Sequence, residues 1–275
     1  MTFRWRRATM QMVQDAEREQ AEVKAFLADP AAYPDRPARV DRLETHGALV
    51  FLAGDEAWKI KRAVRFPYMD FSTLEKRRSV CLRELEINRT WAPELYLGCV
   101  PITREPDGEL KIDGKGEIVE WAIRMRRFHQ DDLLDRIAEN RGVDGDLARS
   151  LADAAFDSHT KARLAPGPGG ERLARLIVSV SRTLAELRPL LPQGHAQSFG
   201  EEARRWHERV AGLLDTRAEQ GFVRRCHGEL HLGNIVLWQG RPLLFDAIEF
   251  DEEIATIDTL YDLAFLLMDL DHRSL

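Results

Sequence analysis

The sequence predicts an α+β protein with two lobes, the first rich in strands and the second rich in helices. Short apolar stretches separated by turn residues dominate residues 35–127, whereas residues 128–275 carry apolar residues at helical spacing. The length of 275 residues is near the limit for one hydrophobic core, so it fits either one large domain or two unequal lobes. With 44% hydrophobic and 31% charged residues, the composition is that of a globular protein and excludes a disordered chain.

Charge, hydropathy and cysteine content narrow the class of protein further. The net charge of −6 removes the electrostatic case for nucleic-acid binding. No apolar run reaches the roughly 20 residues that span a bilayer, and no apolar segment of a secretory signal follows Met1–Arg7. The three cysteines are too widely spaced to indicate a disulfide framework. We therefore expect a soluble cytoplasmic protein without a nucleic-acid or membrane partner.

Residues 1–34 are expected to form a helix and a connector. The apolar spacing predicts a helix over Met10–Ala28. Asp29-Pro30 should end it, because a residue that precedes proline is disfavoured in the α conformation.

Residues 39–61 predict three strands joined by tight turns. The strands are expected over Arg39–Thr45, Ala48–Ala53 and Ala57–Lys61. Because side chains alternate along a strand, Lys59 and Lys61 should lie on one face, and Trp58 and Ile60 on the other. Gly47, in the first turn, could let backbone amides approach a phosphate, although a single glycine is more often a simple turn residue.

The remaining elements follow from caps and periodicity. Ser72-Thr-Leu-Glu75 matches a capping box with Ser72 as the N-cap, and predicts a helix that runs to about Trp91. Further strands are expected over Leu97–Ile102 and Glu117–Phe128, with a turn-rich stretch between them. Helices are then expected over Asp131–Glu139, Asp146–Arg163, Glu171–Leu190 and Phe199–Glu219.

The chemistry is concentrated in the segment Cys226-His-Gly-Glu-Leu-His-Leu-Gly-Asn234. Short apolar strands, Ile235–Trp238 and Leu243–Phe245, follow it, and the second strand ends at Asp246. A loop that supplies a carboxylate and an asparagine, followed by a hairpin that delivers an aspartate, suits phosphoryl transfer to a hydroxyl. One carboxylate accepts the hydroxyl proton, while asparagine and aspartate oxygens hold Mg²⁺ against the phosphates of ATP.

This segment resembles the catalytic loop of aminoglycoside phosphotransferase-like kinases. The resemblance extends from about Arg39 to the end of the chain, and it looks closest to a bacterial subfamily often fused to a C-terminal P-loop ATP-binding domain. It implies a two-lobed protein-kinase-like fold, ATP and Mg²⁺ as cofactors, and a small-molecule hydroxyl as the acceptor, for example that of an aminoglycoside or another sugar or alcohol. The matching segments are Pro37–Val40, Phe71–Arg78, Ala92–Gly98, Phe245–Phe250 and Tyr261–Met268.

The resemblance also implies roles for individual residues. Lys59 matches the lysine that contacts the α- and β-phosphates, and Glu84 the helix glutamate that pairs with it. Asn234 and Asp246 match the two Mg²⁺ ligands, and Glu229 occupies the position of the catalytic base. Ile123 to Arg127 should be the hinge whose backbone hydrogen-bonds adenine, which assigns Ile123 and Met125 to nucleotide binding.

Two departures from the family pattern qualify these roles. The family has aspartate where this chain has Glu229, and the extra methylene moves the carboxylate by about 1.5 Å. A misplacement of roughly 1 Å can lower a rate about 10²-fold, so the alternative is a catalytically weakened module that only binds nucleotide. The family fold also continues for several helices beyond Tyr261–Met268, which suggests that this chain has a truncated C-terminal lobe and lacks a P-loop partner domain.

Other interpretations of the same residues stay open. Lys61 is placed as well as Lys59 for the phosphate. Glu84 could instead be half of a surface ion pair, and its neighbour Glu86 is a weaker candidate on the same helix. Asp258 and Asp262 should anchor the catalytic loop by hydrogen bonds. A remote alternative is a zinc site, because soft and borderline ligands fall within six residues of one another at Cys226, His227 and His231.

Overall fold

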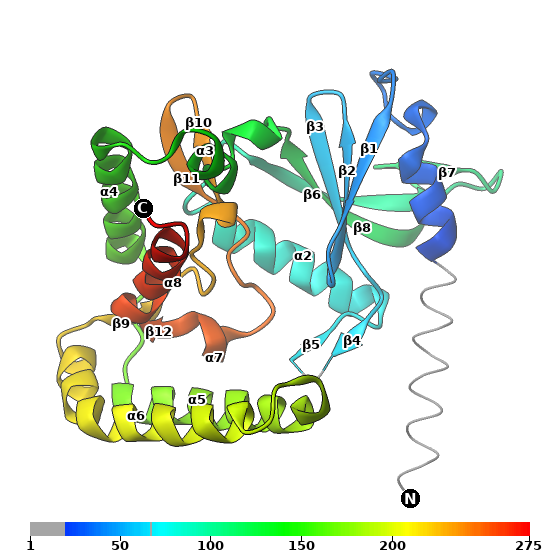
Figure 1. The fold of residues 1–275 in the computed structure, drawn as a ribbon. Helices are drawn as coiled ribbons and strands as arrows, with labels where there is room; N and C mark the ends of the chain where they lie inside the picture. The colour runs from blue at the N-terminus through cyan, green and yellow to red at the C-terminus, as the bar shows by residue number, and fades with distance from the viewer. Residues whose placement is uncertain (1–19, 67) are drawn as a thin grey trace, which may run out of the picture. The chain divides into compact units, whose positions relative to one another are not determined.

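The computed structural model describes residues 20–66 and 68–275, and they divide into two compact units (Figure 1). The first unit runs to Arg136 and includes the later segment Ile235–Asp251. The second unit comprises Ile137–Asn234 and Glu252–Leu275.

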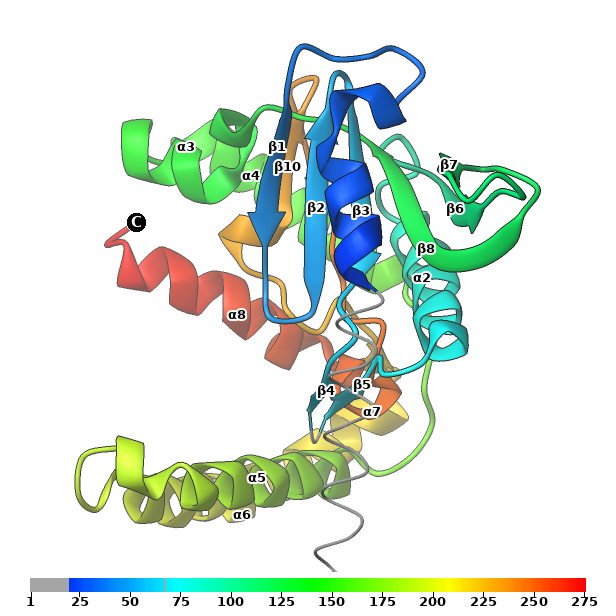
Figure 2. The same cartoon turned by 90° about the vertical axis from the view of Figure 1, so that its right-hand side faces the viewer.

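An antiparallel sheet of six strands is the centre of the first unit, in the order β1-β2-β3-β8-β6-β7 (Figure 2). The strand β3 (Glu56–Lys61) lies between β2 and β8, with Lys59 opposite Val50 on one side and opposite Ile123 on the other. The other strands are β1 (Val40–Glu44), β2 (Ala48–Ala53), β6 (Tyr96–Arg104), β7 (Leu110–Ile112) and β8 (Glu117–Arg126).

The two faces of this sheet bury different sets of side chains. On one face, Phe51, Trp58 and Ile60 pack with Val23 and Leu27, which belong to the helical residues 20–28. The cluster on the other face is formed with the helix α2 (Leu74–Asn88) and the hairpin of β10 (Ile235–Trp238) and β11 (Arg241–Leu244); its buried members include Cys81, Leu95, Tyr96, Ile123, Val236 and Leu243. The alternation predicted for Trp58 and Ile60 against Lys59 and Lys61 is confirmed.

The hairpin β10–β11 belongs to the first unit because its apolar residues pack there. Val236 is fully buried in the same cluster as Tyr96 and Ile123. The compact units therefore differ from the expected lobes, 35–127 and 128–275, in that the segment carrying Asp246 clusters with the sheet.

The start of α2 corrects the predicted capping box. The N-cap is Thr73, whose hydroxyl accepts a hydrogen bond from the Lys76 amide at 3.3 Å. Ser72 is not the cap, because its hydroxyl donates to Asp70 Oδ1 at 2.6 Å. Asp70 ends a short hairpin of β4 (Arg65–Phe66) and β5 (Met69–Asp70), which the sequence did not predict.

The second unit is mainly helical, as predicted. The paired helices α5 (Gly169–Glu186) and α6 (His195–Glu219) lie side by side along much of their length (Figures 1 and 2). Gly169 permits this approach, because a Cβ there would lie 2.4 Å from the Leu214 carbonyl oxygen. The other elements are α3 (Leu134–Arg141), which crosses the boundary between the units, α4 (Gly145–Lys161), β9 (Val223–Arg225), α7 (Glu252–Ala255), β12 (Thr256–Asp258) and α8 (Thr259–His272).

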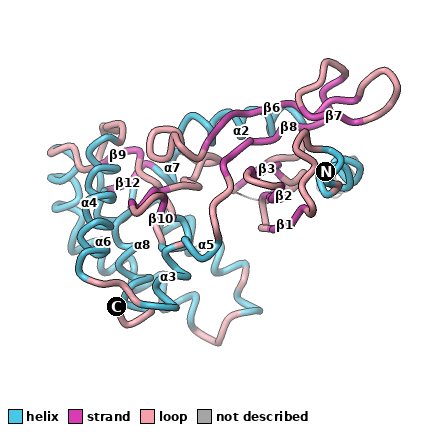
Figure 3. The backbone as a smooth tube through the Cα atoms, turned by 90° about the horizontal axis from the view of Figure 1, so that it is seen from above, coloured by secondary structure: helices cyan, strands magenta, loops and turns pink. Residues whose placement is uncertain are grey.

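Most predicted elements agree with the structure within a few residues. The helix expected over Met10–Ala28 is present from residue 20 to 28, and its earlier part lies outside the described residues. The turn-rich stretch after Ile102 contains an additional strand, β7, which is visible beside β6 in Figure 3. Among the described residues, no helix combines the length and the apolar character needed to cross a membrane.

Candidate functional site

A cluster of two lysines and three carboxylates lies in the first unit. Lys59 Nζ is 2.8 Å from Glu84 Oε1 and also hydrogen-bonds Asp246. Lys61 Nζ is 2.5 Å from both Glu84 Oε2 and Glu249 Oε1. The cluster therefore joins β3, α2 and the segment that follows β11, and both lysines share Glu84.

Sequence alternation explains how two lysines reach the same carboxylate. Lys59 and Lys61 are two residues apart on β3, so they project from the same face. Glu84 projects from the buried side of α2 towards that face, with no exposed side-chain surface. Because Glu84 is buried, the alternative that it forms a surface ion pair is wrong. On this helix, Glu86 forms such a pair, with Arg83.

Burial and charge set the protonation of the cluster. Burial lowers the pKa of Lys59, but Asp246 and Glu84 outweigh this effect and hold that pKa well above its ordinary value. Burial raises the pKa of Glu249, and the neighbouring Lys61 only partly opposes the shift. Two cations face three anions when all five groups are ionised, which leaves an excess negative charge beside Asp246.

Asp246 is the cluster member most open to solvent, with 41% of its side chain exposed. Its backbone has a φ of 59°, a left-handed conformation that is uncommon outside glycine and recurs at functional sites. Two side chains hold this conformation. The Tyr96 hydroxyl accepts from the Asp246 amide at 3.1 Å, and Asn88 Oδ1 accepts from the Ala247 amide at 2.9 Å.

Asn88 and Tyr96 were not predicted as site residues. The signal for Asn88 was present, because it lies one helical turn after Glu84 and so projects from the same side of α2. Tyr96 gave no comparable signal, since an aromatic residue at the start of a strand is usually a core residue. Tyr96 is buried like a core residue, and this burial raises the pKa of its hydroxyl well above the ordinary value.

Gly47, Ile123 and Met125, which were assigned to nucleotide binding, lie outside the lysine cluster. Gly47 packs against Met69, whose Cε would lie 3.1 Å from a Cβ on that glycine. Ile123 and Met125 are buried in β8, and both are paired with β3 on one side and β6 on the other. Their peptide groups therefore face neighbouring strands of the sheet, and their assignment to nucleotide binding stays a prediction.

The predicted catalytic loop lies in the second unit. Asp262, on α8, accepts hydrogen bonds from the amides of His227 at 3.3 Å and Gly228 at 2.7 Å. Oδ2 of Asp262, which accepts from the His227 amide, also lies 3.0 Å from His159 Nε2. The anchoring role predicted for Asp262 is thus confirmed, and Asp258 instead pairs with Arg217 and caps α8.

Within this loop, Glu229 and Asn234 adopt contrasting environments. Asn234 is buried and its Nδ2 donates to the Glu229 carbonyl oxygen at 2.9 Å, so the amide oxygen is the atom left for a metal ion. The Glu229 side chain is 53% exposed, and its carboxylate lies 3.8 Å from His231 Nε2. An exposed carboxylate next to an asparagine has the groups needed to accept a proton beside a metal site.

The remote zinc assignment is wrong in its ligand set. Cys226 is buried and its thiol hydrogen-bonds the Ile257 carbonyl, and no set of potential metal ligands within the described residues combines it with His227 and His231. The group that does converge there is His159, Cys226 and Asp262. The hydrogen bonds of Asp262 to His159 and to two loop amides account for that group without a metal.

Comparisons with known proteins bear on the fold and on the extent of the chain. No family model matches the sequence. The chain is 32% identical over 247 residues to the uncharacterized protein Rv2004c of Mycobacterium tuberculosis, and equally to the uncharacterized protein Mb2027c of Mycobacterium bovis. The match covers 84% of this chain and 46% of each relative, so the chain spans about half the length of the curated relatives it matches.

Two solved structures are similar to this chain. A choline/ethanolamine kinase family protein from Mesorhizobium loti has a TM-score of 0.50 at 17% identity, covering 91% of this chain and 70% of that one. The GDP and kanamycin complex of APH(2")-IIIa is less similar, with a TM-score of 0.46 at 15% identity over 89% of this chain and 80% of that one. The chain therefore has the two-lobed protein-kinase-like fold of mixed strands and helices, the α+β class that the sequence predicted, and it shares this fold with the choline/ethanolamine kinase family protein.

Proposed function

We propose that this protein is an ATP-dependent phosphotransferase that moves the γ-phosphoryl group to a hydroxyl of a small molecule. The observation that carries the proposal is the buried Lys59, held 2.8 Å from the helix residue Glu84 and bonded to the exposed Asp246. A lysine held in this way is positioned to bind phosphates, and a neighbouring exposed carboxylate suits a magnesium ion. The kinase-like fold supports the proposal by analogy.

In this proposal Lys59 binds the α- and β-phosphates, and Glu84 keeps its side chain in position. Asp246 and Asn234 have oxygen atoms of the type that magnesium prefers, and the excess negative charge around Asp246 favours a divalent cation. When bound, magnesium would neutralise charge that develops on the transferred phosphoryl group. The pairing of Asn234 with Asp246 as ligands is taken from the sequence motif.

Glu229 is proposed to act as the base. Its carboxylate would accept the proton of the acceptor hydroxyl while that oxygen forms a bond to the γ-phosphorus. The bond from the γ-phosphorus to the bridging oxygen breaks at the same time, and ADP leaves with the electron pair. His227 is buried and bonded within the loop, so its proposed role is to shape the loop.

Glu229 also supports a second candidate, a nucleotide-binding module without transfer activity. The longer side chain and its high exposure leave the carboxylate less constrained than an aspartate would be at this position. In this version the first unit keeps Mg·ATP, and the protein acts through binding. In the longer relatives, nucleotide binding by this module would then act on the remainder of the chain.

The two candidates are distinguished by a transfer assay with Mg·ATP and a panel of aminoglycosides and amino alcohols. The phosphotransferase proposal predicts a phosphorylated acceptor with the native chain, no product with Asp246→Asn, and more product with Glu229→Asp. If Glu229→Asp leaves turnover unchanged or lowers it, glutamate is not a compromised base. Tight Mg·ATP binding without any product, even in Glu229→Asp, would favour the binding module.

A further inference from the structure

A cavity lies in the first unit, on the sheet face opposite the lysine cluster. Its volume is about 640 Å³, within the range of small-molecule sites. Trp58 is next to Lys59 on β3 but projects to the other face, so the cavity and the lysine cluster lie on opposite sides of one strand. None of the residues assigned to phosphotransfer lines this cavity.

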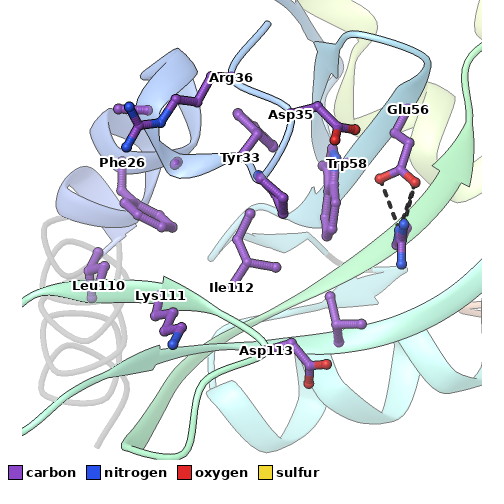
Figure 4. A pocket seen from close by; sticks show the side chains of 15 residues that line it. Phe26, Tyr33, Asp35, Arg36, Glu56, Trp58, Leu110, Lys111, Ile112 and Asp113 are labelled. Atoms are coloured by element: carbon purple, nitrogen blue, oxygen red, sulfur yellow. Dashed lines mark hydrogen bonds and ion pairs between the residues drawn. The ribbon is translucent and has the colours of Figure 1, made fainter.

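The middle of the cavity is aromatic and aliphatic. Phe26 and Tyr33 approach it from the N-terminal segment, and Leu110 and Ile112 from β7, and Trp58 closes the side opposite Phe26 and Leu110 (Figure 4). The Tyr33 and Trp58 rings lie 5.8 Å apart. Such walls accommodate the apolar part of a ligand.

Trp58 carries an unsatisfied donor at this cavity. The residue is 4% exposed, yet its indole Nε1 has no hydrogen-bond partner among the residues that the structure describes. Buried polar groups are paired in the great majority of cases, so an unpaired indole N–H on a cavity wall calls for an acceptor. The Tyr33 hydroxyl is different, because it already donates to the Leu27 carbonyl at 2.6 Å.

The charged groups of the cavity are separated by sign. Figure 4 shows Asp35, Glu56 and Asp113 on the side of Trp58, and Arg36 and Lys111 on the side of Phe26 and Leu110. Arg124 is the exception to this separation: it pairs with Glu56, with Nε 2.9 Å from Oε2, and the hydrogen bond to Glu56 and the charges of Asp35 and Asp113 raise its pKa. Among the described residues, Asp35 and Asp113 form no ion pair within 4.0 Å, and neither do Arg36 and Lys111.

We propose that this cavity binds a zwitterionic ligand with an apolar middle, of the class of a short peptide or an amino-acid derivative. Its ammonium group would lie at Asp35 and Asp113, and its carboxylate at Arg36 and Lys111. The apolar part lies against Phe26 and Trp58, and a carbonyl oxygen accepts from the Trp58 indole N–H. One molecule thereby places a positive charge beside the two acids and a negative charge beside the two bases.

The test uses the dipeptide Leu-Phe, its N-acetyl form without the ammonium group, and its C-terminal amide without the carboxylate. Calorimetry measures the affinity, and a ¹H–¹⁵N spectrum follows the Trp58 indole N–H, assigned with Trp58→Phe. The exposed acids are changed together in Asp35→Asn/Asp113→Asn. Asp107→Asn is the matched control, because Asp107 is also an exposed acid beside β7 but does not line the cavity.

We expect Leu-Phe to bind and to shift the Trp58 indole resonance. N-acetylation and the double acid variant should each weaken binding about tenfold or more, and the two changes together should weaken it little further, because both remove the same interaction. Asp107→Asn should bind like the native chain. The proposal is overturned if the folded chain binds none of the peptide forms, or binds all three equally. It is likewise overturned if the Trp58 indole resonance does not shift, or if Asp107→Asn weakens binding as much as the double acid variant.

Discussion

Glu84→Gln is the substitution that tests the buried cluster most sharply. The Glu84 carboxylate has no exposed surface and lies 2.8 Å from Lys59 Nζ and 2.5 Å from Lys61 Nζ. Removing one partner of a buried ion pair typically costs about 3–5 kcal/mol. Each lysine keeps a second carboxylate, Asp246 for one and Glu249 for the other, so we expect a cost of about 3 kcal/mol, at the lower end of that range.

The assay is urea unfolding followed by tryptophan fluorescence. Of the five tryptophans among the described residues, four belong to the first unit, namely Trp58, Trp91, Trp121 and Trp238. The midpoint should fall while the slope stays unchanged, because the exposed area on unfolding does not alter. Mg·ATP affinity should fall with it, since Lys59 loses the group that orients it.

Glu86→Gln is the control on the same helix. Its side chain is 70% exposed and pairs with Arg83 one turn earlier, so its loss should cost under about 1 kcal/mol. If Glu84→Gln is as mild as Glu86→Gln in both stability and nucleotide affinity, the lysines do not depend on Glu84 and the reasoning is refuted.

Three further substitutions test the rest of the account by urea unfolding. Gly169→Ala should destabilise the pair α5 and α6, because its Cβ would lie 2.4 Å from a carbonyl oxygen. The control Gly212→Ala, in open space on α6, should stabilise the protein by about 0.5–1 kcal/mol. Equal effects of the two substitutions would contradict the close approach of the helices. Asp262→Ala leaves two buried loop amides unpaired and should lower the free energy of unfolding by about 3 kcal/mol. The control Asp271→Asn, at an exposed position on the same helix, should lower it little. A small effect of Asp262→Ala would mean that other contacts hold the loop. Burial opposes ionisation of Asp70, but hydrogen bonds from Lys76 and Ser72 prevail and lower its pKa to about 2. Its contribution is therefore present above pH 4 and lost as the pH falls from about 4 to 2, so the loss caused by Asp70→Asn should be smaller at pH 3 than at pH 7, and a pH-independent loss would contradict this.

The sequence predicted the fold well where local signals and burial agreed. Strand alternation placed Lys59 and Lys61 opposite Trp58 and Ile60, and the residue before Pro30 ended the first helix. Short elements escaped prediction because a two-residue strand such as β4 or β5 has no measurable periodicity. The N-cap shifted by one residue because Ser72 and Thr73 are both good caps, and Asp70 decides between them by binding Ser72.

The site was predictable in its residue types and less so in its connections. The lysine, the helix glutamate and the hairpin aspartate could be named from the motif, but periodicity could not show that Lys61 and Glu249 extend the cluster. The assignment of Ile123 and Met125 to a hinge stays a prediction, because these residues look the same in sequence whether β8 ends before or after them. The order of strands in the sheet, with β8 between β3 and β6, decides this, and it depends on long-range pairing.

Calorimetric titration of ATP, with and without Mg²⁺, tests the central claim most directly. The native chain and Asp246→Asn are compared, because Asp246 is exposed enough for the variant to fold. We predict Mg²⁺-dependent binding of one ATP per chain, lost in Asp246→Asn and kept in the control Asp107→Asn. A folded native chain that binds no ATP, or binds it equally without Mg²⁺ and in Asp246→Asn, would contradict the account.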